Sequence, residues 1–134
     1  FVCRDWGWAT IKLARQAHPK PAALPLDMLL EAERYYGHSF YLLNNFLTNT
    51  RAPGKEPDAA LVKDYWEIAL RLQQVRISAG RAGNKEAYND IHKFVNEYQD
   101  RIRKQSDLWS KFLRYWEYAL EQMGKDPQEF IKAG

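Results

Sequence analysis

The chain has 134 residues, 46% hydrophobic and 14% aromatic, which suffices for one buried core and is too apolar for a disordered protein. Its 20 basic and 17 acidic residues leave a formal charge of +3, whereas a nucleic-acid binder of this size more often has a dominant basic face. The single cysteine excludes an internal disulfide and a thiolate metal cage.

The amino-terminal residues predict a short amphipathic helix that prolines separate from the rest of the chain. Apolar side chains recur on one face of residues 1–17, at Val2, Trp6, Ala9, Leu13 and Ala17. Prolines at 19, 21 and 25 then end regular structure, because proline lacks an amide hydrogen and disfavours helix in the residue before it. We therefore expect a single all-helical domain over 1–134, with an N-terminal helix on a Pro-rich hinge (1–20) and a bundle body (26–134).

The chain begins with Phe1 and not with methionine, so we expect either a processed mature form or an excerpt of a longer protein. Loss of a targeting peptide would favour an organelle as its location. No stretch of the sequence reaches the roughly eighteen apolar residues that a membrane span requires, which predicts no transmembrane segment.

Two helices of similar length are expected next. The first runs from near Leu26 to about Thr48 and carries Gly37 in its middle, where a missing side chain would let a backbone or an aromatic ring approach. Residues 51–58 are typical of a loop. The second helix has a stripe at Leu61, Tyr65, Ile68, Leu72, Val75 and Ala79. A turn over 80–84, with a glycine stop and Asn84 as helix cap, makes it an antiparallel neighbour of the next helix.

The last third of the chain carries a heptad pattern that predicts one long helix over 85–123. Its stripe is Tyr88, Ile91, Val95, Tyr98, Ile102, Gln105, Trp109, Phe112, Trp116, Ala119 and Met123. Such a helix would be about 55–60 Å long, against about 35 Å for each of its neighbours. We expect it to be continuous because the heptad phase passes unbroken through 105–107, with a break at Gln105-Ser106-Asp107 as the alternative. Gly124 and the Asp126-Pro127-Gln128-Glu129 capping box then predict one short final turn.

A helix that long would extend past its neighbours with its aromatic end uncovered. Apolar residues surround most of the helix between 108 and 123, and a soluble monomer seldom exposes that much apolar surface. We therefore expect a protein partner there, unless the first helix and the final turn fold back over this end. The predicted partner-binding residues are Trp109, Phe112, Tyr115, Trp116 and Tyr118, with Trp6 and Trp8 of the first helix as a second contact.

No catalytic, cofactor-binding or metal-binding motif is recognisable. The histidines His18, His38 and His92 are far apart and belong to no ligand motif. Glu33 lies on an apolar stripe, where a hydrogen-bonded or partly solvated carboxylate is the ordinary explanation. A ligand pocket between Tyr36, Phe40, Tyr65 and Trp66 is a third hypothesis, which a pocket filled by the protein's own side chains would exclude.

The sequence thus predicts an all-α antiparallel bundle of three main helices plus an N-terminal helix, with one long C-terminal helix. Its predicted function is that of a non-catalytic accessory or scaffold subunit of a multi-protein assembly, for which an organellar membrane-bound energy-converting complex is one setting. The alternative is a basic helical nucleic-acid-binding subunit of a ribonucleoprotein. Its candidate contacts are Arg71, Arg76, Arg81, Lys85, Arg101, Arg103 and Lys104.

Overall fold

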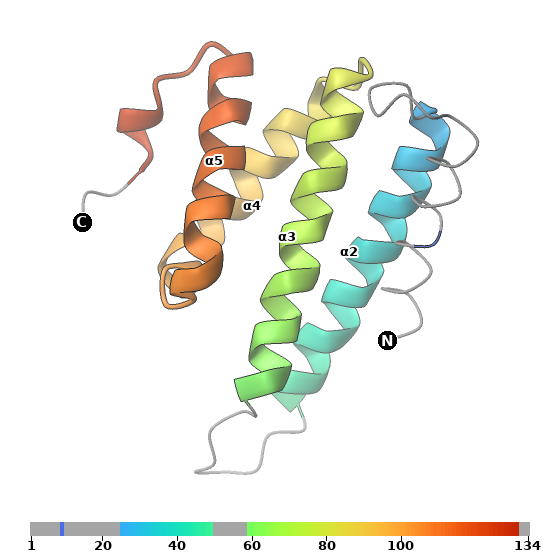
Figure 1. Ribbon diagram of the computed structural model, residues 1–134, viewed down its shortest axis with the longest axis vertical. Coiled ribbons are helices and arrows are strands. Elements are labelled where there is room, and N and C mark those ends of the chain that lie inside the picture. Colours follow the sequence, from blue (N-terminus) through green and yellow to red (C-terminus); the bar gives the residue numbers. More distant parts are fainter. Residues whose placement is uncertain (1–8, 10–24, 50–58, 132–134) are drawn as a thin grey trace.

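The computed structural model describes residue 9 and residues 25–49 and 59–131. The last two segments form α2 (Leu26–Asn49), α3 (Ala59–Arg81), α4 (Glu86–Ile102), α5 (Ser106–Gln122) and the 3-10 turn η2 (Pro127–Glu129). The helices run alternately up and down (Figure 1). The predicted all-α antiparallel bundle is confirmed. The proposed N-terminal helix face and proline hinge, together with the loop over 51–58, lie outside the described residues except at Ala9 and Pro25.

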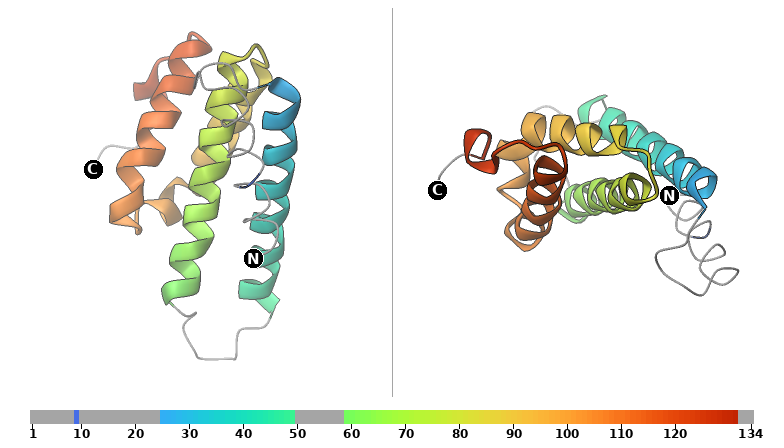
Figure 2. Two further views of the ribbon diagram at one scale, coloured as in Figure 1. Left: turned by 45° about the vertical axis from the view of Figure 1, so that its right-hand side comes forward. Right: turned by 90° about the horizontal axis from the view of Figure 1, so that it is seen from above.

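Helix α3 is the centre of the bundle and contacts α2, α4 and α5 (Figure 2). Its predicted stripe is buried apart from the half-buried Leu61, and other apolar residues widen the buried surface. The buried side chains of α3 are those of Tyr65, Trp66, Ile68, Ala69, Leu70, Leu72, Gln73, Val75, Ile77 and Ala79. A helix that is apolar on most faces must be covered on most faces, and α3 meets this requirement with three neighbours.

The expectation of one continuous helix over 85–123 was wrong, because the chain turns back at residues 103–105. Helix α4 ends at Ile102 and α5 begins at Ser106, so the two form an antiparallel hairpin. Gln105 has φ −96° and ψ 75°, which is not a helical conformation. Folding back places the apolar faces of both arms against each other and against α3, and each fully buried Phe-sized side chain contributes about 1.5–3 kcal/mol.

Glycines shape the other turns of the hairpin region. Gly83 adopts φ +115° between α3 and α4, and Gly124 adopts φ +71° just after α5, so both glycine stops predicted from the sequence are present. Lys85 occupies the N-cap position of α4, and no side chain caps the first turn of this helix. The cap predicted at Asn84 is therefore not found. The capping box is confirmed in part, since the Asp126 carboxylate accepts a hydrogen bond from the Gln128 amide at 3.0 Å.

Gly80 and Gly37 differ in what surrounds them. A Cβ added to Gly80 would lie 2.4 Å from the Tyr88 ring, so the absence of a side chain lets the first turn of α4 pack against the end of α3. A Cβ added to Gly37 would meet no atom of the described residues within 4 Å. The close approach expected at Gly37 is therefore not found among the described residues, where Gly80 is a glycine that permits one.

We predict that Gly80→Ala destabilises the protein by roughly 1–3 kcal/mol, the usual cost of forcing extra atoms into a packed site. The cost should shrink when Tyr88 is first replaced by leucine, which removes the ring atoms that the new methyl group meets. Urea unfolding of the two single variants and the double variant measures this. An equal cost of Gly80→Ala in both backgrounds would contradict the explanation.

Candidate protein-interaction surface

The aromatic residues of α5 that the sequence assigned to a partner occupy two different environments. Phe112 and Trp116 are 0% exposed and belong to the core of this chain. Because the hairpin covers them, the uncovered helix end from which partner binding was inferred does not exist. Neither side chain reaches a surface that another protein could contact.

Trp116 is held by a hydrogen bond across the hairpin. Its indole Nε1–H donates to Nδ1 of His92 on α4 at 3.1 Å, and the Phe130 ring meets the His92 ring edge-to-face at 4.6 Å. The Gln99 side-chain amide also donates to the Phe130 carbonyl at 3.4 Å. The final turn therefore folds back over α4 and α5, as the sequence allowed.

Three half-buried aromatic residues of α5 are each held by the protein itself. The Tyr115 hydroxyl accepts a hydrogen bond from the Gln74 side chain at 3.1 Å. The Tyr118 hydroxyl accepts one from Arg81 at 3.2 Å, which lowers the pKa of Tyr118. The Trp109 ring lies 4.7 Å from the guanidinium carbon of Arg103. Trp6 and Trp8, the other predicted contacts, lie outside the described residues.

A cluster of rings joins α2, α3 and α4 where the sequence suggested a ligand pocket. Phe40 stacks on Tyr65 at 4.4 Å between centroids, and Tyr65 meets Trp66 at 4.7 Å. Burial raises the pKa of Tyr65 to about 12, and its hydroxyl donates to Asn44 at 3.1 Å. Tyr36 is 0% exposed. The protein's own side chains occupy this space, which excludes the pocket hypothesis as it was framed.

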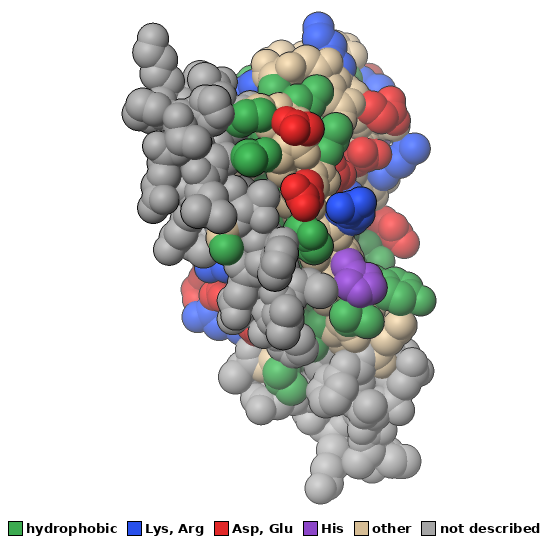
Figure 3. Space-filling view, turned by 90° about the vertical axis from the view of Figure 1, so that its right-hand side faces the viewer, with side chains coloured by type: hydrophobic (Ala, Val, Ile, Leu, Met, Phe, Trp, Pro, Cys, Tyr) green, Lys and Arg blue, Asp and Glu red, His purple; other side chains and the backbone are tan. Residues whose placement is uncertain are grey.

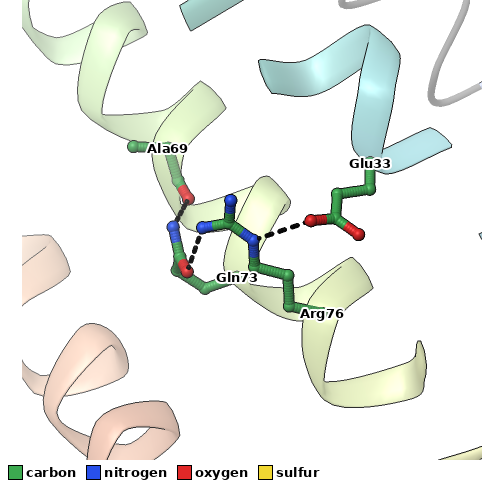
Figure 4. Close-up of polar contacts among 4 residues, drawn as sticks. All are labelled: Glu33, Ala69, Gln73 and Arg76. Atoms are coloured by element: carbon green, nitrogen blue, oxygen red, sulfur yellow. Dashed lines mark hydrogen bonds and ion pairs between the residues drawn. The ribbon is translucent and has the colours of Figure 1, made fainter. Parts of the chain in front are cut away.

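The arginine side chains of α3 interact with other residues of the same chain. In Figure 4 the Arg76 guanidinium bridges two helices: its Nε donates to Glu33 of α2 at 3.1 Å and its Nη1 to Gln73 at 3.2 Å. Gln73 in turn donates to the Ala69 carbonyl at 3.0 Å. This pairing explains how Glu33 is accommodated on an apolar stripe. Arg71 has further interactions of its own.

The remaining candidate nucleic-acid contacts fall at opposite ends of α4. Arg81 and Lys85 lie at the α3–α4 turn, and Arg101, Arg103 and Lys104 lie at the α4–α5 turn. The 17 residues of α4 between them span about 25 Å. The Arg101 guanidinium also lies within 5.2–5.8 Å of the centroids of three rings, those of Tyr65, Trp66 and Tyr98. The structure does not gather these cations into one basic face.

Exposed apolar residues instead occur on α2, a surface that the sequence reasoning missed. Four large apolar side chains of α2 are exposed: Met28 (37%), Leu30 (40%), Tyr41 (61%) and Leu42 (45%). Figure 3 shows this side of the molecule, where hydrophobic side chains lie among charged ones. The available signal was that these four residues fall off the main stripe of α2. Sequence alone gave no means of deciding which face the domain would cover.

Comparison with known proteins adds no assignment: no family model, no curated protein and no solved structure matches the chain. Within residues 25–49 and 59–131, no three His, Cys, Asp or Glu side chains lie close enough together to hold a metal ion. None of the helices in the described part of the chain is both long and apolar enough to cross a membrane. The function is therefore argued from the exposed surface of α2.

We predict that His92 makes the protein lose stability as the pH falls below about 6.5, the ordinary pKa of histidine. Burial, and secondarily the charge of Lys125, lowers the pKa of His92 in the folded chain. The unfolded chain then binds more protons just below pH 6.5, so the contribution present above pH 6.5 is lost as the pH falls towards the folded pKa. Urea unfolding at several pH values, monitored by circular dichroism, measures the loss.

The matched variants for this prediction are His92→Phe and His38→Gln. The first should lower stability at pH 7.5, because the Trp116 N–H loses its acceptor at a cost of about 1–3 kcal/mol, and should flatten the pH dependence. The second changes an exposed histidine and should leave most of the slope unchanged. A wild-type slope that survives in His92→Phe would assign the titration to another group.

Proposed function

We propose that this protein is a non-catalytic helical subunit of a larger protein assembly, and that it packs a helix of a neighbouring subunit against the outer face of α2. The observation that supports this is the exposure of Leu30, Tyr41 and Leu42 on one helix, while the apolar faces of α3, α4 and α5 are buried within the chain. Exposed large apolar side chains on the outward side of one helix occur at interaction sites.

The chemistry of this face favours a protein partner over a small ligand. Tyrosine and leucine on a helix surface supply broad contact area with few directional groups, which suits the face of another helix. Charged residues of both signs border the apolar ones, namely Asp27, Arg34 and the half-buried Glu31. A mixed polar border around apolar anchors is the usual arrangement in protein interfaces.

The ribonucleoprotein alternative has weaker support. Arg101 and Lys104 are exposed at the α4–α5 turn, but Arg76 and Arg81 are engaged with Glu33 and Tyr118. Six to ten phosphate contacts would make binding fall about 10³- to 10⁵-fold between 50 and 200 mM salt. We expect a labelled single-stranded RNA titrated at both salt concentrations to show no such drop, and a steep drop would favour the alternative.

We predict that Leu30→Ser combined with Tyr41→Ser removes the protein from its assembly. The companion chains would be identified by purifying the tagged protein from its native source, and then prepared in pure form and recombined with it. Loss of two interface anchors should weaken the reconstituted complex at least about tenfold, since a few aromatic and aliphatic side chains carry most interface energy. Isothermal titration calorimetry measures the affinity.

The control is Lys111→Ser combined with Gln122→Ser on α5, where both side chains are exposed and polar. It alters the same number of surface residues on a different helix and should leave the affinity unchanged. Circular dichroism should show both double variants folded like the wild type. Unchanged affinity of the α2 variant, with loss in the α5 control, would place the contact on the other side of the molecule.

A further inference from the structure

One flank of α2 carries four residues on a single line. Leu30, Arg34, Gly37 and Tyr41 follow at steps of four, three and four, which places them on one side of a helix. Leu30 and Tyr41 are 40% and 61% exposed, and Arg34 is exposed as well. We call these four residues the open flank. Buried residues of the same helix, such as Ala32 and Ser39, lie on the opposite side.

Gly37 leaves a gap in the middle of the open flank that no residue in the described part of the chain fills. Glycine is disfavoured within helices because its backbone loses more conformational freedom on folding than that of any other residue. At Gly80 the gap is filled by the Tyr88 ring, whereas at Gly37 a Cβ would meet no atom within 4 Å in residues 25–49 and 59–131. The gap in α2 is therefore open to the backbone of another helix.

We infer that the neighbour packed on α2 is α2 of a second copy of this chain, crossing antiparallel at Gly37. This inference rests on the proposed docking role of α2 and names its occupant. A two-fold axis at Gly37 would place the two glycines together at the crossing point, where the missing side chains allow the helices to approach closely.

The same axis pairs the other members of the open flank with complementary groups. With a rise of about 1.5 Å per residue, Tyr41 lies about 6 Å from the axis, and Arg34 of the second copy lies about 4.5 Å from it on the same side. A guanidinium beside a tyrosine ring is a favourable contact, and the same pair occurs twice. Leu30 of the second copy lies about 10.5 Å from the axis, on the other side of the Tyr41 ring.

Self-complementarity favours a second copy over an unrelated partner. In the dimer, the Tyr41 ring of one copy would meet both Arg34 and Leu30 of the other copy. The charged residues of the outer face include both signs, with Asp27 and Glu31 beside Arg34, so no net charge selects an acidic or a basic partner. One pair of helices buries a small area, which corresponds to a weak, concentration-dependent dimer.

The test is sedimentation equilibrium of the full chain over a wide concentration range, with Gly37→Leu as the main variant. The wild type should shift from the mass of one chain to that of two as its concentration rises. A Cβ at Gly37 meets no atom of the described residues within 4 Å, so we expect Gly37→Leu to fold, which circular dichroism checks, while its dimer should weaken at least about tenfold. Ser110→Leu adds the same side chain at an exposed position of α5 and should leave dimerisation unchanged.

Each outcome separates this inference from the proposed function. A wild type that stays monomeric at every concentration overturns the inference, and the reconstituted complex then tests the docking role of α2 by itself. A wild-type dimer that neither Gly37→Leu nor Tyr41→Ala weakens also overturns it, because the contact would then lie elsewhere. A dimer that both substitutions weaken, and that Ser110→Leu leaves intact, supports it.

Discussion

The burial of α3 on several faces is the constraint on which the rest of the fold depends. Its aromatic residues Tyr65 and Trp66 pack against Phe40 of α2, and its other faces contact α4 and α5. A helix with this much apolar surface cannot be covered by one neighbour. The chain supplies the remaining cover by folding its last third into a hairpin, which brings two further helices to α3.

Buried polar groups fix this arrangement more specifically than apolar packing does. Trp116 donates to His92, which is 24 residues earlier in the chain. In one continuous helix those residues would lie about 36 Å apart and the indole could not reach its acceptor. The partly buried ion pair between Arg76 and Glu33 acts similarly between α3 and α2. A buried polar group without its partner is costly, so such pairs favour the hairpin over other ways of covering the same apolar surface.

The sequence predicted the fold class, the bounds of α2 to within a residue or two, and both glycine stops, because these features depend on local signals. It failed at residues 103–105. A heptad phase is informative within one helix, but a turn reverses the chain direction and makes the phase across it meaningless. In the hairpin each arm presents its own stripe to the core. The length of the predicted rod was the better signal, since a helix of about 57 Å leaves Phe112 and Trp116 without a neighbour.

The turn at residues 103–105 also explains why the sequence predicted an interaction surface on α5, whereas the surface proposed from the structure is on α2. A helix exposes apolar residues when it has fewer neighbours than apolar faces, and the number of neighbours is a property of the whole fold. Helix α5 gained α4 as a neighbour through the hairpin, so its apolar faces became internal. Within the described part of the chain, helix α2 packs chiefly on α3, with Leu29, Tyr36 and Leu43 buried and Leu30 and Tyr41 exposed. The apolar residues of α5 and the exposed apolar residues of α2 look alike in the sequence. Only the arrangement of the other helices distinguishes the core from the proposed contact surface.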